Sequence, residues 1–224
     1  RHVTGVQTCA LPILKMERPL RTTINISNLI RMGVPKEFIY KSMNDFHDFG
    51  SKNLKALKNF IIDYINNFSD NIRYNRGLFL YGSNGVGKSF IASNLVKEAY
   101  IRRYTARRVT FSDYIAHYTD SWGATNPETR ELYIGEFYQY YKGVDVLVIE
   151  EIGKELDTKL ATTLLEDCLR YREEKGKLTI ICTNLNPTMI KEKYGNSIAS
   201  LIQGNMTPIK IVADDKRQLV YKDK

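Results

Sequence analysis

The stretch GSNGVGKS, residues 82–89, limits what this 224-residue chain can fold into more than any other. It fits the pattern G-x-x-x-x-G-K-[ST], with an apolar run before it and a helical pattern after it, at Gly82, Gly87, Lys88 and Ser89. Glycines let backbone N–H groups curl around phosphates, and the N-terminus of the next helix adds partial positive charge. A glycine-rich turn is the alternative, but a chance match in such a chain occurs about once in a hundred. We therefore expect this protein to bind a nucleoside triphosphate.

The loop assigns a role to each of its polar side chains. Lys88 is expected to reach the β- and γ-phosphates, and the Ser89 hydroxyl to ligate magnesium. ATP and Mg²⁺ are therefore the expected cofactors. The residues expected to contact the nucleotide are Gly82, Ser83, Asn84, Gly85, Val86, Gly87, Lys88, Ser89 and Phe90.

Apolar runs and helical patterns alternate along the rest of the chain. Strands are predicted over residues 77–82, 107–111, 144–150, 177–184 and 209–213. Helices are predicted over residues 54–68, 89–104, 113–118, 158–175 and 186–195, and after a turn at 123–127. This alternation favours an α/β fold, in which a parallel sheet is flanked by helices on both faces.

Some of these helices carry more detailed expectations. The first places apolar side chains on one face, namely Leu54, Leu57, Phe60, Ile61, Ile65 and Phe68. The helix over 158–175 does the same with Leu160, Leu164, Cys168 and Tyr171. Ser112 is expected to cap the short helix that follows it. Asn186 and Pro187 are expected to open a helix that Gly195 closes.

Two adjacent carboxylates, Glu150 and Glu151, end the most apolar of the predicted strands. A buried strand that runs out into solvent would explain them. The phosphate loop upstream favours another interpretation, because in P-loop ATPases a second strand ends in a carboxylate that holds the magnesium ion. Glu150 then takes the metal position, and Glu151 the position of a base that activates the attacking water.

The net charge of +8 suggests a negatively charged partner. Basic and aromatic side chains gather at one point, in Arg102, Arg103, Tyr104, Arg107 and Arg108, with Phe111 following. Cations for phosphates beside rings for base stacking are typical of a surface that binds single-stranded nucleic acid. A solvated helix end followed by a strand explains any one of these residues equally well.

The remaining composition narrows the class of protein. No apolar run approaches the roughly 18 residues of a membrane span, which argues against a membrane-spanning class. Cys9, Cys168 and Cys182 lie far apart without metal spacing, which favours reduced thiols in a cytoplasmic protein. The stretch VTGVQTCALPI resembles translated read-through of a sequencing-library adapter. We therefore expect residues 1–13 to be an artefact, Cys9 to carry no meaning and the native start to be missing.

Several motifs occur in one order along residues 33–217, namely GVPKEF, FHDF, the phosphate loop, VLVIEEIG, ICTN and ADDKR. Together they resemble the DnaC/DnaI-type helicase loaders and, more distantly, the IstB-type transposition helpers, both of which are AAA+ ATPases. The resemblance implies a P-loop NTPase fold of the AAA+ type. It also implies an ATPase domain over 54–217, a tail over 218–224, and a lead-in over 14–53 as a remnant of an N-terminal partner-binding region.

The resemblance also implies roles for single residues. Asn184, at the end of ICTN, is similar to the sensor that hydrogen-bonds the γ-phosphate or the attacking water. Turn chemistry alone also explains an asparagine at this position. Arg217 in ADDKR resembles the family's terminal arginine near the phosphates, and a surface arginine in a basic tail is the alternative.

Two positions depart from the family's pattern. The magnesium-holding residue is usually Asp, whereas here it is Glu150, whose extra methylene moves the carboxylate by roughly 1.5 Å. The family usually has arginines in the helix after YG, one of which acts on the neighbouring subunit's nucleotide. Here Ser197 and Leu201 stand at those places, which predicts slow or partner-dependent hydrolysis. The candidate substitutes are Lys191, Lys193 and Arg217.

For function, the resemblance implies a helicase-loader-like ATPase, encoded by a phage or mobile element. It would deliver a replicative helicase to single-stranded DNA in DNA replication, and self-assembly into a homo-oligomer is left open. Two alternatives stay open as well. One is an IstB-like transposition helper ATPase, which acts with a transposase and duplex DNA. The other is a nucleotide-binding adaptor without turnover.

Overall fold

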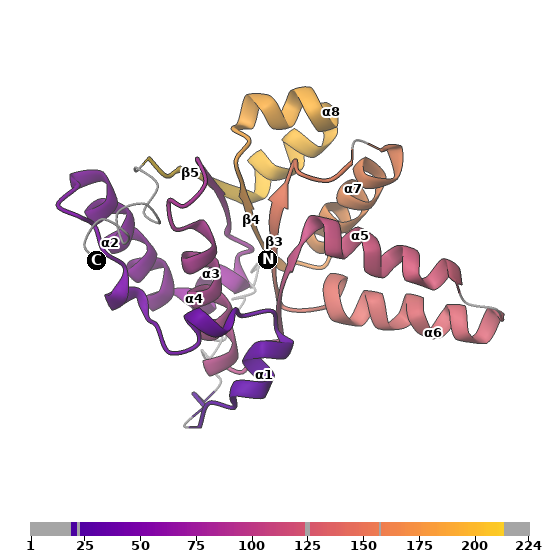
Figure 1. The fold of residues 1–224 in the computed structure, drawn as a ribbon, viewed down its shortest axis with the longest axis horizontal. Coiled ribbons are helices and arrows are strands. Elements are labelled where there is room, and N and C mark those ends of the chain that lie inside the picture. Colours follow the sequence, from indigo (N-terminus) through magenta and orange to yellow (C-terminus); the bar gives the residue numbers. More distant parts are fainter. Residues whose placement is uncertain (1–18, 22, 124–125, 157, 213–224) are drawn as a thin grey trace, which may run out of the picture.

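The computed structural model describes residues 19–21, 23–123, 126–156 and 158–212. Within them, five strands form a parallel sheet in the order β2-β3-β4-β1-β5 (Figure 1). The strands are β1 (Gly77–Tyr81), β2 (Ala106–Thr110), β3 (Val146–Ile152), β4 (Leu178–Thr183) and β5 (Met206–Lys210). The expectations for residues 1–13, Arg217 and the tail over 218–224 lie outside the described residues.

Helices cover both faces of this sheet (Figure 1). One face carries α1 (Ile26–Arg31), α2 (Lys52–Asn66), α3 (Phe68–Arg73) and α4 (Lys88–Ile101). The other carries α5 (Phe111–Asp120), α6 (Pro127–Phe137), α7 (Lys159–Glu174) and α8 (Pro187–Asn205). In β1, Leu78 and Leu80 pack into the first core and Phe79 into the second, because successive side chains of a strand point to opposite faces. The predicted α/β fold is confirmed.

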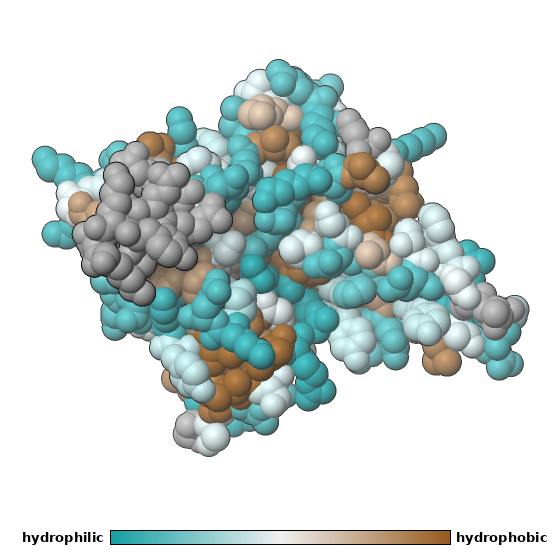
Figure 2. All heavy atoms as spheres, viewed as in Figure 1, coloured by the Kyte–Doolittle hydropathy of each residue, from teal (hydrophilic) through white to brown (hydrophobic). Residues whose placement is uncertain are grey.

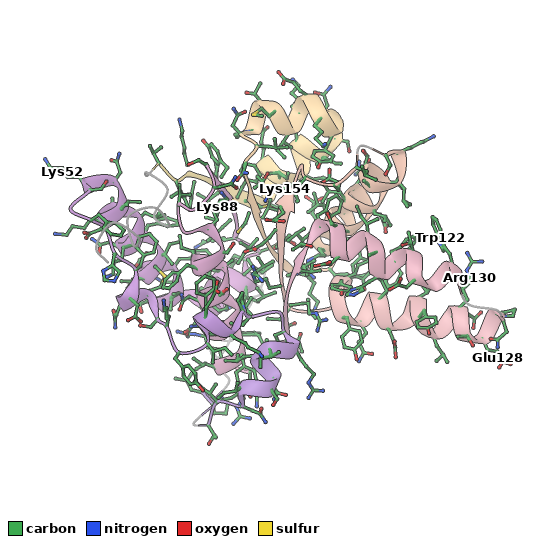
Figure 3. All side chains as sticks on the ribbon, viewed as in Figure 1. Lys52, Lys88, Trp122, Glu128, Arg130 and Lys154 are labelled. Carbon is green, nitrogen blue, oxygen red and sulfur yellow. The ribbon has the colours of Figure 1, made fainter. Side chains whose placement is uncertain are left out.

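Shorter turns of helix join these elements. They are the 3₁₀ turns η1 (Lys36–Phe38), η2 (Met43–Asp45) and η3 (Ser121–Gly123), and the π-helical turn η4 (Tyr138–Lys142). In Figure 1, α5 and α6 run side by side as an arm that extends away from the sheet. The tip of this arm carries Trp122, Glu128 and Arg130, which Figure 3 labels.

The start of α8 agrees with its predicted caps. The Asn186 side chain accepts a hydrogen bond from the Met189 amide at 3.0 Å, and Pro187 is the first helical residue. The predicted end is also present, because Gly195 has φ 88° and ψ 174°, and a second helical segment follows it.

The predicted cap at Ser112 is wrong. Helix α5 already begins at Phe111, so Ser112 lies inside it. The Thr110 hydroxyl, at the end of β2, accepts a hydrogen bond from the Asp113 amide at 3.1 Å instead. A threonine that belongs to the strand therefore satisfies the first turn of this helix.

The buried faces of two helices differ in detail from the predicted ones. On α2, Phe60 is 40% exposed, whereas Tyr64 is buried and its hydroxyl donates to the Arg76 carbonyl at 2.6 Å. On α7, Tyr171 is only half-buried, whereas the neighbouring Arg172 is fully buried. Both differences arise because a long side chain with a polar end can enter a core when that end finds a partner.

The last strand lies closer to α8 than the sequence predicts. β5 runs over Met206–Lys210, whereas the prediction covered residues 209–213. Pro208 falls inside the strand and pairs with Phe79 of β1. A proline is tolerated here because β5 is an edge strand. Among the described residues no strand lies on its outer side, so no carbonyl of a strand there needs the N–H that proline lacks.

The lead-in packs against the ATPase core. Leu29, Val34, Met43 and Phe46 are buried in the first core, beside α2 and α4. Lys97 of α4 donates from Nζ to backbone carbonyls of the lead-in, including that of Phe38 at 2.7 Å. The segment around η1 and η2 is therefore a wall of the same folded unit. The predicted boundary between lead-in and ATPase domain at residues 53 and 54 stays a prediction.

Candidate nucleotide-binding site

The loop, the paired carboxylates and Asn184 meet at one edge of the sheet. β1 leads into the loop over residues 82–87, β3 carries Glu150 and Glu151 just before its last residue, and β4 leads into Asn184. Because the strands are parallel, their carboxyl ends lie together, where open α/β sheets bind ligands. A cavity of about 880 Å³ opens there, lined by all of these segments and by the lead-in.

Two glycines of the loop cannot be replaced without strain. Gly87 is the N-cap of α4 with φ 102°, and an added Cβ would lie 3.1 Å from the Phe46 ring. An added Cβ at Gly82 would lie 2.3 Å from the carbonyl oxygen of Ile211. This oxygen belongs to the backbone, which cannot move aside as a flexible side chain could. The loop thus wraps the start of α4 closely, with the lead-in against one side and the end of β5 against the other.

Lys88 is held over the loop. Its Nζ donates to the carbonyls of Gly82 at 2.7 Å and Ser83 at 2.6 Å, and to Asn184 Oδ1 at 2.8 Å. The Asn184 amide in turn donates to Asn84 Oδ1 at 2.9 Å. The structure therefore brings the predicted sensor to the phosphate loop. In Figure 3, Lys88 and Lys154 lie near the same end of the sheet.

Glu150 is buried beside the start of α4. Its Oε2 accepts hydrogen bonds from the Ser89 hydroxyl at 3.1 Å and from Nη2 of Arg108 at 2.5 Å. Its Oε1 is buried and has no hydrogen-bond partner among the described residues. A buried carboxylate oxygen without a partner, next to a serine hydroxyl, is the oxygen donor set that magnesium prefers. These two residues fit a magnesium ion, and their role as its ligands stays a prediction.

Glu151 is turned out of the regular strand. It has φ 61°, and the register of β3 against β4 shifts between Glu150 and Ile152. Such an irregularity re-aims a side chain and is frequent beside active sites. The Glu151 carboxylate lies at the rim of the cavity and accepts a hydrogen bond from Lys154 Nζ at 2.6 Å, with both side chains 47% exposed. Its role as a general base stays a prediction.

The whole central part of the chain, residues 78–203, matches the ATPase family associated with various cellular activities (AAA). The chain belongs to the AAA family. This makes it a nucleotide-binding protein of the ATPase type. Two curated relatives are the replicative helicase loader DnaC of Buchnera aphidicola subsp. Acyrthosiphon pisum, 23% identical over 194 residues, and the replicative helicase loader DnaI of Bacillus subtilis, 23% identical over 140 residues. The first match covers 85% of this chain and 74% of the relative; the second covers 62% and 42%.

Solved structures show the same AAA fold. A DnaC helicase loader matches with a TM-score of 0.66 and 21% identity, over 80% of this chain and 100% of that one. DnaI matches with a TM-score of 0.65 and 20% identity, over 82% of this chain and 94% of that one. AMPPCP-bound DnaA from Aquifex aeolicus matches with a TM-score of 0.60 and 17% identity, over 81% and 54%. The predicted likeness to helicase loaders of the AAA+ type is confirmed.

The basic and aromatic residues predicted to bind nucleic acid fall into two groups in this AAA protein. Arg102 pairs with Glu98 on α4, and Arg107 lies over the Tyr140 ring, 5.4 Å from its centre. Arg103 is exposed and Tyr104 is half-buried, close to the end of α4. Arg108 instead enters the nucleotide cavity and pairs with Glu150. Four of the five residues therefore remain near the surface, and their contact with DNA stays a prediction.

The positions where the family places arginines after YG lie on the second segment of α8. Leu201 is buried, 8% exposed, and Ser197 is half-buried. The Ser197 hydroxyl accepts a hydrogen bond from Nη2 of Arg170 on α7 at 2.7 Å, and Arg170 is 59% exposed. Of the three substitutes considered, Lys193 lies 3.7 Å from Glu155 and Lys191 is exposed, while Arg217 lies outside the described residues.

Sequence reasoning missed the contribution of the lead-in to the cavity. Pro35, Phe38, Phe46, His47 and Phe49 line it, with the Phe46 ring beside Gly87 of the phosphate loop. The three phenylalanine rings add apolar surface to the cavity, which Glu37, Lys41 and Asp45 of the same segment also line. The recurrence of Phe in an otherwise polar segment was the available signal.

Among the described residues, no helix combines the length and apolar character that crossing a membrane requires.

Proposed function

We propose that this chain binds ATP with magnesium in the cavity and acts as a helicase-loader-like protein. It would bring a replicative helicase onto single-stranded DNA. The observation that carries the proposal is the convergence of Lys88, Ser89, Glu150 and Asn184 at one sheet edge. Support for the partner comes from the similarity, over 85% of the chain, to a protein named replicative helicase loader.

Each side chain of the site has a task that its position suits. The loop amides and Lys88 would hold the phosphates, and Lys88 would exchange a carbonyl of the loop for a phosphate oxygen. Ser89 and Glu150 would hold the magnesium ion, which neutralises phosphate charge when it is bound. Glu151 would accept a proton from the attacking water, and Asn184 would orient that water or the γ-phosphate.

The partner-binding part of the proposal rests on the lead-in. Figure 2 shows an apolar patch over α1. Ile24, Ile26 and Ile30 are 50%, 39% and 43% exposed there. Clustered exposed apolar side chains mark interaction surfaces on soluble proteins. The patch suits contact with another protein, and the lead-in also lines the nucleotide cavity, so one segment would serve both.

A nucleotide-binding adaptor without turnover is the second candidate. The observation that favours it is the contact between Glu151 and Lys154, which engages the proposed base with a cation. A second is that Ser197 stands where the family places an arginine. Under this alternative the chain binds ATP with the same residues and does not hydrolyse it.

Binding and turnover separate these functions. The wild type should bind a fluorescent ATP analogue with magnesium, and Lys88→Ala should abolish binding. ATP hydrolysis should then be measured alone, with single-stranded DNA and with the replicative helicase. Stimulated phosphate release that Glu151→Gln abolishes supports the loader, whereas binding without release under all three conditions supports the adaptor. Absence of binding in the wild type would contradict both.

The loader function needs one further measurement. The wild type should retain the helicase in a pull-down, and Ile26→Asp with Ile30→Asp should release it, since charge on an apolar contact surface opposes binding. Tyr40→Asp is a matched control, because Tyr40 is 83% exposed and lies in the same lead-in away from α1. Equal retention of the helicase by all variants would show that the apolar patch of the lead-in does not bind the helicase.

A further inference from the structure

Arg108 connects the lead-in to the carboxylate at the metal position. It lies on β2, an edge strand, and its Nη2 donates to Oε2 of Glu150 at 2.5 Å. Its Nη1 donates to the Gly33 carbonyl at 2.8 Å, and its backbone amide donates to the Met32 carbonyl at 2.8 Å. One guanidinium thus contacts both the turn after α1 and the side chain that faces Ser89.

These contacts leave the Glu150 carboxylate asymmetric. Oε2 takes two donors, from Arg108 and from Ser89, whereas Oε1 takes none among the described residues. The Glu150 side chain is 4% exposed, so water does not replace the missing partner freely. A buried acceptor without a partner is costly unless a ligand uses it. The orphaned oxygen is therefore the one available to a metal ion.

Stability alone does not explain the pair. Nε of Arg108 is buried and has no hydrogen-bond partner among the described residues, so the guanidinium gives up one donor to reach Glu150 and Gly33 together. Buried ion pairs are weak contributors to stability because desolvation offsets their attraction. Glutamate has one more rotatable bond than the aspartate that usually stands here. Holding that longer side chain in one conformation requires a second contact beyond Ser89.

We infer that Arg108 is a positioning residue for the metal half of the site. It fixes Oε2 of Glu150 and thereby leaves Oε1 for the magnesium ion. This inference rests on the proposed nucleotide function. It also reassigns Arg108, which the sequence placed among the nucleic-acid contacts. Arginine is suited to the task because its planar fork contacts two acceptors at once, which a lysine ammonium cannot reproduce in the same geometry.

The test is the magnesium dependence of nucleotide binding. A fluorescent ATP analogue is titrated at increasing magnesium concentration, and again in EDTA, against the wild type, Arg108→Met and Arg108→Lys. Arg108→Met should raise the magnesium concentration for half-maximal binding roughly tenfold or more, the usual effect of losing the residue that orients a metal ligand. The affinity of Arg108→Met for the analogue in EDTA should equal that of the wild type. The magnesium requirement of Arg108→Lys should lie between those of the wild type and Arg108→Met.

Arg107→Met is the matched control. Arg107 is the preceding residue on β2, and it contacts the Arg31 carbonyl and the Tyr140 ring rather than Glu150. Its loss should leave the magnesium requirement unchanged. If Arg108→Met fails to fold, Arg108→Gln removes the charge and keeps a donor for Gly33, and it carries the same test. Manganese binding, followed by the electron paramagnetic resonance of free Mn²⁺, gives a readout independent of the analogue.

A double-mutant cycle decides whether Arg108 acts through Glu150. In a Glu150→Gln background, adding Arg108→Met should change the magnesium requirement no further. The inference is overturned if Arg108→Met and Arg108→Gln keep or lower the wild-type requirement, or if they lose only affinity for single-stranded DNA. Failure of the proposed function is distinct, since it appears as nucleotide binding in the wild type that Lys88→Ala does not reduce.

Discussion

Lys88 and Asn184 are 96 residues apart in sequence, and Nζ of the lysine donates to Oδ1 of the asparagine at 2.8 Å. The same asparagine donates to Asn84 Oδ1 at 2.9 Å, so the residue after β4 contacts the phosphate-loop motif at two points. A nucleotide that enters the cavity would come into contact with these three side chains. Asn184 is therefore placed to respond to whatever occupies the loop.

Replacing this asparagine should separate binding from turnover. Asn184→Ala should leave affinity for the ATP analogue nearly unchanged, because under the proposed function the loop amides and Lys88 would supply most of the phosphate contacts. Hydrolysis should fall about 10²-fold, the order expected when one polar group is removed from the reacting end of a site. Single-turnover phosphate release measures this. Asn196→Ala, an exposed asparagine on α8, is the control, and equal rates for both variants would contradict the assignment.

If the chain is a loader that hydrolyses ATP, the contact of Glu151 with Lys154 should matter little for turnover, whereas the adaptor alternative gives it weight. Both side chains are 47% exposed, and exposed ion pairs contribute about 0–1 kcal/mol. Lys154→Ala should therefore change the hydrolysis rate by less than about fivefold. Glu151→Gln, by contrast, should reduce it by at least about 10²-fold, as for loss of a general base. A large gain of activity in Lys154→Ala would instead show that Lys154 restrains the base.

Arg170 should matter for turnover if copies of this chain assemble. It lies beside Ser197, where the family places an arginine; its side chain is 59% exposed, and its guanidinium pairs with Glu166 on the same helix at 2.7 Å. Arginines supplied by a neighbouring subunit raise hydrolysis by about 10³–10⁵. Wild-type turnover per molecule should then rise with protein concentration, and in Arg170→Ala it should not. Arg130→Ala, at the tip of the arm, is the control. Concentration-independent turnover in the wild type would argue against this role.

Asp145 should make stability depend on pH. Its carboxylate accepts hydrogen bonds from the Thr105 amide and hydroxyl, both at 3.0 Å, and from Lys177 Nζ at 2.9 Å. Burial alone would raise the pKa of Asp145, but the bonds from Lys177 and Thr105 outweigh it, so the pKa lies below the ordinary 3.8. A lowered pKa in the folded state stabilises the fold above the unfolded pKa, and this stability is lost as pH falls through the folded value.

The matching substitution is Asp145→Asn. At pH 7 it should lower the free energy of unfolding by about 1–3 kcal/mol, because a charge-assisted hydrogen-bond cluster is weakened. The difference from the wild type should shrink below about pH 4, where the carboxylate of the unfolded chain begins to take up a proton that the folded chain binds only at lower pH. Urea denaturation at both pH values measures it. Asp120→Asn, at an exposed position on α5, should show no such difference.

Much of the site could be predicted because its signals are local. The loop motif, the carboxylates after an apolar strand and the asparagine after β4 each lie within a few residues of a strand end. Parallel strands then bring those ends together, and this follows from the fold class alone. Asn184 was singled out by the resemblance to helicase loaders, and the pairing of β4 with β1 is what places it beside Lys88.

The rest depends on contacts between distant segments. Nothing near Arg108 in the sequence indicates that Gly33 lies beside it, so the residue was grouped with its basic neighbours. The burial of Arg172 could not be predicted from the sequence either. This side chain is fully buried and donates hydrogen bonds to the carbonyls of Val144 at 2.9 Å and Leu178 at 2.5 Å, among others. Burial lowers its pKa to about 10. A charged residue at a helix end normally faces solvent, and only the assembled sheet supplies these acceptors.

Neither edge of the sheet is an easy place for another chain to add a strand. On β5, Pro208 lacks the donor that an added strand would need, and on β2 the amide of Arg108 already donates to Met32. Proteins recruit one another through open strand edges when these offer unpaired groups. An assembly of this chain with itself or with a helicase would therefore be built from helices and loops, which can release a partner without breaking the sheet that holds the nucleotide.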